Sequence, residues 1–156
     1  MPFKPSKRTP GDDASALSVG LRLASRRAHT QAELAKKLAA RGFDEQEIGQ
    51  AIDRLKALNA LDEDDVTATR VAEMLAHDAR MTPRVAQAKL EQRGIPREIA
   101  HSAVRTAFSD WDPKEAALAY VGSETDVDRA ARRLAQRGFP TEAILWVVRH
   151  LAKPDL

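Results

Sequence analysis

The hydrophobic pattern of the chain is dominated by one seven-residue segment that occurs three times. Each copy reads basic–Leu–x–x–Arg–Gly–apolar, and the copies cover residues 37–43, 89–95 and 133–139. The glycines of successive copies are separated by 52 and 44 residues. Aliphatic residues recur six, ten and thirteen positions after each glycine, which keeps a shared helical phase beyond the segment itself. We interpret the three segments as an internal repeat.

Helix-capping residues stand before each copy of the repeated segment. Thr30 with Glu33 forms a capping-box pattern, and Thr82 precedes Pro83, which is suited to the first helical turn. Asp126 stands at the matching place in the third copy. The glycine of each copy can end a helix in the left-handed conformation at little steric cost. These signals predict three helices, over residues 30–41, 82–93 and 126–137.

Helical patterns flank each of these predicted helices. Downstream, new helices are expected to begin at Asp44, near Pro96 and near Pro140. Upstream, helical stretches are predicted at residues 17–27, 67–79 and 114–121. There is no sustained alternation typical of strands and no Asn-Gly or Asp-Gly hairpin turn. The sequence therefore predicts an all-α fold of three tandem three-helix repeats.

The repeats divide the chain into three modules of similar length. We assign residues 14–60, 61–109 and 110–156 to them, and interpret the proline-containing residues 1–13 as a flexible basic tail. A module of about 45 residues has a small hydrophobic core and should gain stability from its neighbours. We therefore expect an elongated row of modules, able to curve, rather than one sphere.

Composition limits the chemistry that the chain can perform. Its 156 residues carry a formal net charge of +2 and no cysteine, so disulfides, thiolate metal sites and cysteine nucleophiles are excluded. No apolar run is long enough to cross a bilayer, and the basic N-terminus lacks the apolar stretch of a signal peptide. The four histidines form no ligand pair, and no phosphate-binding loop or nucleophile elbow is present. We expect a protein with no catalytic residues, metal or cofactor.

Several polar and aromatic residues receive a structural interpretation. The acidic residues 62–65 lack the spacing of a calcium loop, and are expected to link two modules and to place negative charge at a helix N-terminus. His29, which precedes the Thr30 cap, and Trp111, which lies between two modules, are expected to be structural. For Trp146, packing against a terminal segment or an adjacent module and exposure as an anchor for a partner both remain open.

Positive charge is concentrated on the middle helix of each module. Each of the three predicted middle helices carries a formal charge of +2, which leaves −4 for the rest of a chain whose total is +2. Basic pairs four residues apart share one helix face and stand beside the buried leucines, so we expect them to point outward. Such rows could contact phosphates or an acidic protein surface, although helix-dipole stabilisation and solubility would explain the same residues. The candidate binding residues are Lys37, Arg41, Lys89, Arg93, Arg132, Arg133 and Arg137.

Residues 26–43 carry a more specific signature. They read Arg-Arg-Ala-His-Thr-Gln-Ala-Glu-Leu-Ala-Lys-Lys-Leu-Ala-Ala-Arg-Gly-Phe and continue through Ile48, Ile52 and Leu55. This order resembles the RecX family, bacterial regulators of the RecA recombinase, and the likeness extends over about residues 16–152. Two places depart from the family pattern, since Val66 and Ala68 stand where an aromatic residue is usual and residues 80–83 replace a glycine-rich turn.

The resemblance implies a regulatory protein without catalytic activity. Members of this family lie in the helical groove of the RecA–DNA filament and suppress its ATPase, strand-exchange and coprotease activities. A monomeric, cytoplasmic protein is expected, with RecA filaments on DNA as the partner and direct contact with single- or double-stranded DNA left open. The alternative is an independent helical DNA-binding protein that acts without RecA, which would show naked-DNA affinity with a steep salt dependence.

Overall fold

The computed structural model describes residues 14–153, and helices are the only regular secondary structure within them. This confirms the predicted all-α fold. The predicted basic tail, residues 1–13, lies outside the described residues. The helices are α1 (Ala16–Arg26), α2 (Gln31–Ala40), α3 (Glu45–Ala57), α4 (Asp64–Ala76), α5 (Pro83–Gln92), α6 (Arg97–Ala107), α7 (Pro113–Val121), α8 (Val127–Arg137) and α9 (Thr141–Ala152).

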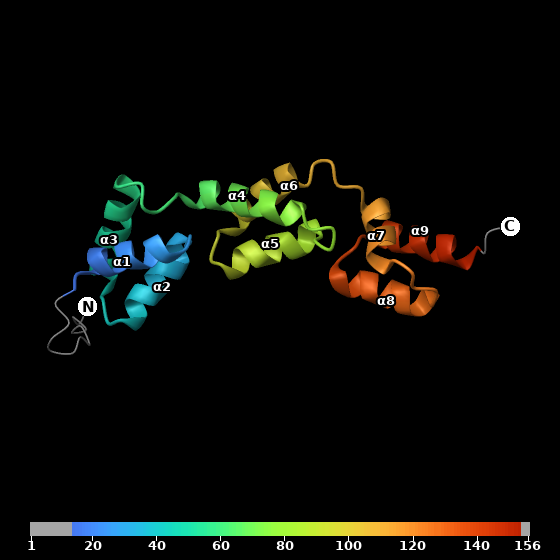
Figure 1. Ribbon diagram of the computed structural model, residues 1–156, viewed down its shortest axis with the longest axis horizontal. Helices are drawn as coiled ribbons and strands as arrows, with labels where there is room; N and C mark the ends of the chain where they lie inside the picture. The colour runs from blue at the N-terminus through green and yellow to red at the C-terminus, as the bar shows by residue number, and fades with distance from the viewer. Residues whose placement is uncertain (1–13, 154–156) are drawn as a thin grey trace.

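The helices form three units that follow one another along the long axis of the molecule (Figure 1). Helices α1–α3, α4–α6 and α7–α9 make up the first, second and third unit, and each unit surrounds its own cluster of buried apolar side chains. The arrangement confirms the predicted elongated row of three-helix repeats. Leu34 and Leu38 in the first unit, Leu90 in the second and Leu134 in the third are fully buried and come from the middle helices.

Local sequence explains where the middle helices begin and end. The hydroxyl of Thr30 accepts the backbone N–H of Glu33, whose carboxylate accepts the N–H of Thr30, so the predicted capping box is confirmed. Thr82 and Asp126 cap α5 and α8 through their side-chain oxygens alone, which accept the backbone N–H groups of Val85 and Arg129. The repeat glycines Gly42, Gly94 and Gly138 have φ values of 87°, 83° and 87°, as predicted for residues that end a helix.

The first helix of each unit starts before the predicted position. Helix α4 begins at Asp64 rather than at Thr67, because Glu63 takes the N-cap position and two acidic residues occupy the first turn. Helix α7 begins at Pro113, where the Asp112 carboxylate accepts backbone N–H groups of the first turn. The acidic residues 62–65 thus supply a negative helix N-terminus as expected, although burial raises the pKa of the Asp64 carboxyl.

Neighbouring units meet where their middle helices abut end to end. The hydroxyl of Thr30, at the start of α2, donates to the backbone oxygen of Arg93, at the end of α5, over 2.6 Å. Thr82 makes the equivalent bond to the backbone oxygen of Arg137 over 3.0 Å. The N-terminus of one middle helix therefore faces the C-terminus of the next, an alignment that the helix dipoles favour.

Apolar contacts add to the second of these junctions. Trp111, between α6 and α7, packs against the clusters of both the second and the third unit, and its ring stacks on Phe139 at 6.0 Å. The structural role predicted for Trp111 is confirmed. Trp146 packs against the cluster of its own unit and stacks on His150 at 5.3 Å, rather than against an adjacent module.

Candidate functional site

The seven predicted binding residues all belong to α2, α5 or α8 or directly follow these helices, but their side chains lie in different environments. Arg41, Lys89 and Arg132 are exposed to solvent. Lys37, Arg93, Arg133 and Arg137 are partly buried. Arg93 and Arg137 depart from the expected outward rows, because their side chains donate hydrogen bonds across the boundaries between units.

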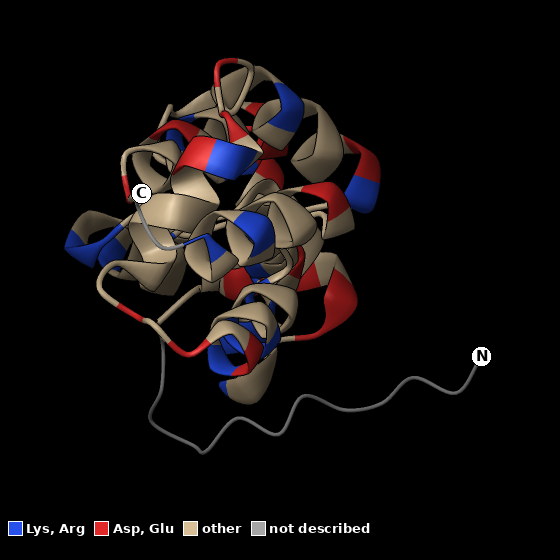
Figure 2. Ribbon diagram, turned by 90° about the vertical axis from the view of Figure 1, so that its right-hand side faces the viewer, with Lys and Arg blue, Asp and Glu red and all other residues tan. Residues whose placement is uncertain are grey.

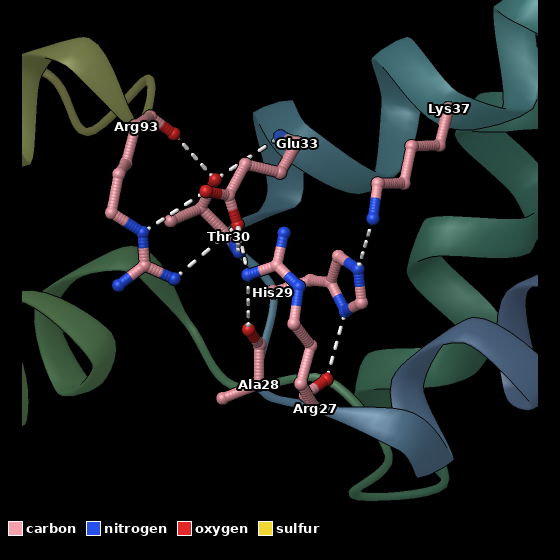
Figure 3. A network of polar contacts seen from close by, with 7 residues as sticks. All are labelled: Arg27, Ala28, His29, Thr30, Glu33, Lys37 and Arg93. Atoms are coloured by element: carbon pink, nitrogen blue, oxygen red, sulfur yellow. Dashed lines mark hydrogen bonds and ion pairs between the residues drawn. The ribbon is translucent and has the colours of Figure 1, made fainter.

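Arg93 is held at the junction between the first and second units (Figure 3). Its Nε and Nη2 donate to the two carboxylate oxygens of Glu33 over 3.0 and 3.3 Å. The side chains of Arg93 and Glu33 are only 27% and 20% exposed. Burial works against ionisation of Glu33, but hydrogen bonds from Arg93 and from the backbone of Thr30 outweigh it and lower the pKa of this carboxyl. Arg93 thus joins two units instead of pointing outward.

Arg137 and Arg133 also make contacts with other residues of the chain. The Nε of Arg137 donates to the backbone oxygen of Arg80 over 2.8 Å, across the junction of the second and third units. The guanidinium groups of Arg133 and Arg137 lie 5.4 and 6.0 Å from the centre of the Tyr120 ring. Arg133 also pairs with Glu124 at 3.7 Å. These contacts hold the third unit together and fix it to the second.

Lys37 and His29 form a hydrogen-bonded pair beside the first junction (Figure 3). His29 is only 5% exposed, and its Nδ1–H donates to the backbone oxygen of Arg27 over 2.8 Å. Its Nε2 then accepts a hydrogen bond of 2.9 Å from the Nζ of Lys37, which requires a neutral imidazole. Burial, together with the charges of Lys37 and Arg27, lowers the pKa of His29. The structural role predicted for His29 is confirmed.

The first unit nevertheless carries a concentration of positive charge, which we call the α1–α2 basic cleft. Two hollows of about 280 and 320 Å³ lie between α1 and α2. Arg26 and Arg41 line both of them, and none of the acidic residues between 14 and 153 lines either. The remaining charged residues of the cleft are Arg22, Arg27 and Lys37.

The cleft exists because α1 packs along α2. That packing brings Arg22 and Arg26 beside Arg41, whose Nη1 donates to the backbone oxygen of Lys37 over 3.1 Å. Sequence reasoning missed Arg22, Arg26 and Arg27, because it grouped basic residues by helix. The signal that could have found them was the spacing of Arg22 and Arg26, four residues apart in a predicted helix.

The guanidinium groups clustered in this cleft are hydrogen-bond donors suited to anions. Each group presents a planar set of donors that matches the oxygens of a phosphate or a carboxylate. Over the rest of the molecule basic and acidic residues are interspersed, as the end-on view in Figure 2 shows. The cleft is therefore a local concentration of positive charge on a nearly neutral protein.

The described residues offer little basis for other kinds of site. Between residues 14 and 153 no group of three or more His, Cys, Asp or Glu side chains is placed to hold a metal ion. No helix in that range has the length and hydrophobicity of a bilayer span.

Comparison with protein families and curated proteins gives a consistent result. Residues 16–55 match the family model described as the first three-helix domain of RecX. The regulatory protein RecX of Chlorobaculum tepidum is 38% identical over 96 residues, which are 60% of this chain and 58% of that protein. Regulatory protein RecX of Mycobacterium ulcerans is 33% identical over 100 residues, or 64% of this chain and 57% of that protein. The chain therefore spans less than two thirds of these relatives' length.

Comparison with solved structures also finds a RecX protein. The crystal structure of RecX from Lactobacillus salivarius superimposes with a TM-score of 0.66 and 19% identity, covering 88% of this chain and 97% of that one. This likeness extends over all three units, whereas the family model matches the first. Together with the sequence matches, it shows that this chain is similar to RecX proteins in sequence and in fold, and that residues 16–55 match their first three-helix domain.

Proposed function

We propose that this protein binds the RecA–DNA filament and lowers the ATPase, strand-exchange and coprotease activities of RecA. The observation that carries the proposal is the α1–α2 basic cleft at one unit of an elongated three-unit row. The resemblance in residues 26–43 supplies the identity of the partner, and the relatives' names supply the regulatory role. The action is that of a bound regulator in the cytoplasm, with no catalytic step.

A row of units suits a polymeric target. A filament repeats the same surface at regular intervals, so each bound unit raises the effective concentration of the next. Several individually weak contacts can then add up to tight binding without a large single interface. The three units of this protein follow one another along one axis, so each would meet a different part of the filament (Figure 1).

The basic residues differ in what they contribute to this proposal. Arg22, Arg26 and Arg41 are exposed and line the cleft, so they would pair with phosphates of DNA or with carboxylates of RecA. Lys89 and Arg132 are exposed on the second and third units and would add secondary contacts. Arg93 and Arg137 would act indirectly, by keeping the units in line.

The test is ATP hydrolysis by RecA on single-stranded DNA, measured while the protein is titrated. The wild-type protein should inhibit hydrolysis, and the variant Arg22→Glu/Arg26→Glu/Arg41→Glu should need at least tenfold more protein for the same inhibition. A control with the same change in charge, Arg97→Glu/Arg105→Glu/Arg149→Glu, alters exposed arginines outside the cleft and should inhibit normally.

Three results would count against the proposal. Unchanged hydrolysis at all protein concentrations would remove the inhibitory role. Equal loss in both triple variants would mean that net charge, rather than the cleft, governs binding. Tight binding to naked DNA with a steep salt dependence and no dependence on RecA would favour the independent DNA-binding function.

A further inference from the structure

A second cleft, of opposite charge, lies at the boundary between the second and third units. It has a volume of about 330 Å³ and is formed by the ends of α4 and α6 together with the start of α7. Its apolar lining includes Met81, Phe108 and Trp111. Met81 and Phe108 are almost fully buried, whereas Trp111 is only partly covered and offers aromatic surface to the cleft.

Four carboxylates surround this apolar lining, and among the residues that the structure describes no basic side chain belongs to it. Asp78 and Asp112 are partly engaged, because one oxygen of each accepts backbone N–H groups of its own turn or helix. For Asp110 and Glu115, both exposed, the described part of the chain provides no ion pair or side-chain hydrogen bond. The cleft therefore combines an uncompensated negative rim with an aromatic lining.

We propose that this cleft binds an arginine side chain carried by a peptide segment of a protein partner. A guanidinium group can stack on the face of a tryptophan and at the same time donate to carboxylates in its plane. A lysine ammonium would lack the planar stacking, and a nucleic-acid backbone would be repelled by the rim.

This proposal concerns a different surface from the α1–α2 basic cleft. It predicts that the protein has two recognition sites of opposite sign, one for anions on the first unit and one for a cationic peptide between the second and third units. Its test needs neither RecA nor DNA, so it can fail while the proposed function stands, and the reverse is equally true.

Fluorescence can follow binding directly, because the chain has two tryptophans and only Trp111 lines the cleft. In the variant Trp146→Phe, emission reports Trp111 alone. The probe is a blocked peptide of sequence glycine–arginine–leucine–arginine–glycine, with a second peptide in which both arginines are replaced by the neutral analogue citrulline. We expect a saturable emission change with the arginine peptide and at least tenfold weaker binding of the citrulline peptide.

Matched variants separate the cleft from general electrostatics. In the same single-tryptophan background, Asp110→Asn/Glu115→Gln should lower the affinity for the arginine peptide about five- to tenfold. This is the loss expected when two partly exposed charge pairs are removed. Asp53→Asn/Glu73→Gln removes the same charge from exposed positions elsewhere and should leave affinity unchanged. No saturable change, equal affinity for citrulline, or equal weakening by both double variants would overturn the proposal. Circular dichroism confirms that each variant keeps its helices.

Discussion

Equivalent residues serve different purposes in the three units. Arg41, Arg93 and Arg137 each precede the glycine that ends a middle helix. Arg93 and Arg137 lie where that helix end meets the preceding unit, and both donate hydrogen bonds across the boundary. Arg41 belongs to the first unit and is exposed beside Arg22 and Arg26. Position in the row, rather than residue type, decides whether an arginine joins units or is available to a partner.

Gly94 is the residue most sensitive to substitution at the first junction. A β-carbon built there would lie 2.3 Å from the Cβ of Ala32, which is fixed to the α2 backbone and cannot move aside. Gly94→Ala should therefore lower the free energy of unfolding by about 3 kcal/mol, from left-handed strain plus overpacking. Urea unfolding measures this loss.

Gly138→Ala is the matched control for that prediction. Its φ of +87° is close to the +83° of Gly94, but the nearest atom to its added β-carbon is the Cδ of Arg84, at 2.9 Å. The flexible side chain of Arg84 can rotate away, so the free energy of unfolding of this variant should fall by only about 1–2 kcal/mol. Equal losses in the two variants would show that the close approach to Ala32 has no energetic weight.

His29 should make stability depend on pH. Its pKa is lowered in the folded protein, so the unfolded chain takes up the proton first as the pH falls. The stabilisation is complete above the ordinary histidine pKa of about 6.5 and is lost as the pH drops through the lower folded value. Unfolding free energies at about pH 8 and pH 5.5 should differ more for the wild type than for His29→Gln. An equal difference would mean that the contact with Lys37 tolerates protonation.

At the scale of helices, the two junctions share one type of hydrogen bond but differ in their additional contacts. Both use a threonine hydroxyl at the start of one middle helix and a backbone oxygen at the end of the next. The first junction adds the ion pair of Glu33 and Arg93, whereas Val85 stands at the place that corresponds to Glu33 in the second unit. At the second junction Trp111 instead packs against the apolar clusters of both units.

A double-mutant cycle with Glu33→Gln and Arg93→Met measures the ion pair of the first junction. Glutamine retains the capping box, so the cycle isolates the interaction between units. We expect a coupling free energy of about 1–2 kcal/mol, because the pair is largely shielded and has two hydrogen bonds. The exposed pair of Asp62 and Arg70 is the control, with an expected coupling below about 0.5 kcal/mol. Similar values for the two pairs would contradict a special role for Arg93.

These helices also show how far the sequence could be interpreted. Caps and glycines act over three or four residues, so Thr30, Thr82 and Gly138 could be assigned their roles directly from the chain. The junction contacts could not, because they join residues 63 and 55 positions apart. The basic cleft was missed for the same reason, since it arises from packing of α1 on α2 rather than from one helix.

At the scale of the whole molecule, the separation of hydrophobic cores explains the shape. Each unit buries its own cluster, and the boundaries between units rely on a few polar bonds and one tryptophan. The result is an extended body (Figure 1). Its two charged clefts belong to different parts of the row, one to the first unit and one to the boundary between the second and third units. Such a body can contact several subunits of a polymer at once, which a compact protein of this size cannot do.

Co-sedimentation with RecA filaments tests this account most directly. Filaments are assembled on single-stranded DNA with a non-hydrolysable ATP analogue, and the protein in the pellet is measured as its concentration increases. We predict saturable binding with fewer than one molecule per RecA subunit, and little protein in the pellet with DNA alone. Protein that remains in the supernatant, or that sediments equally well with naked DNA, would contradict the account.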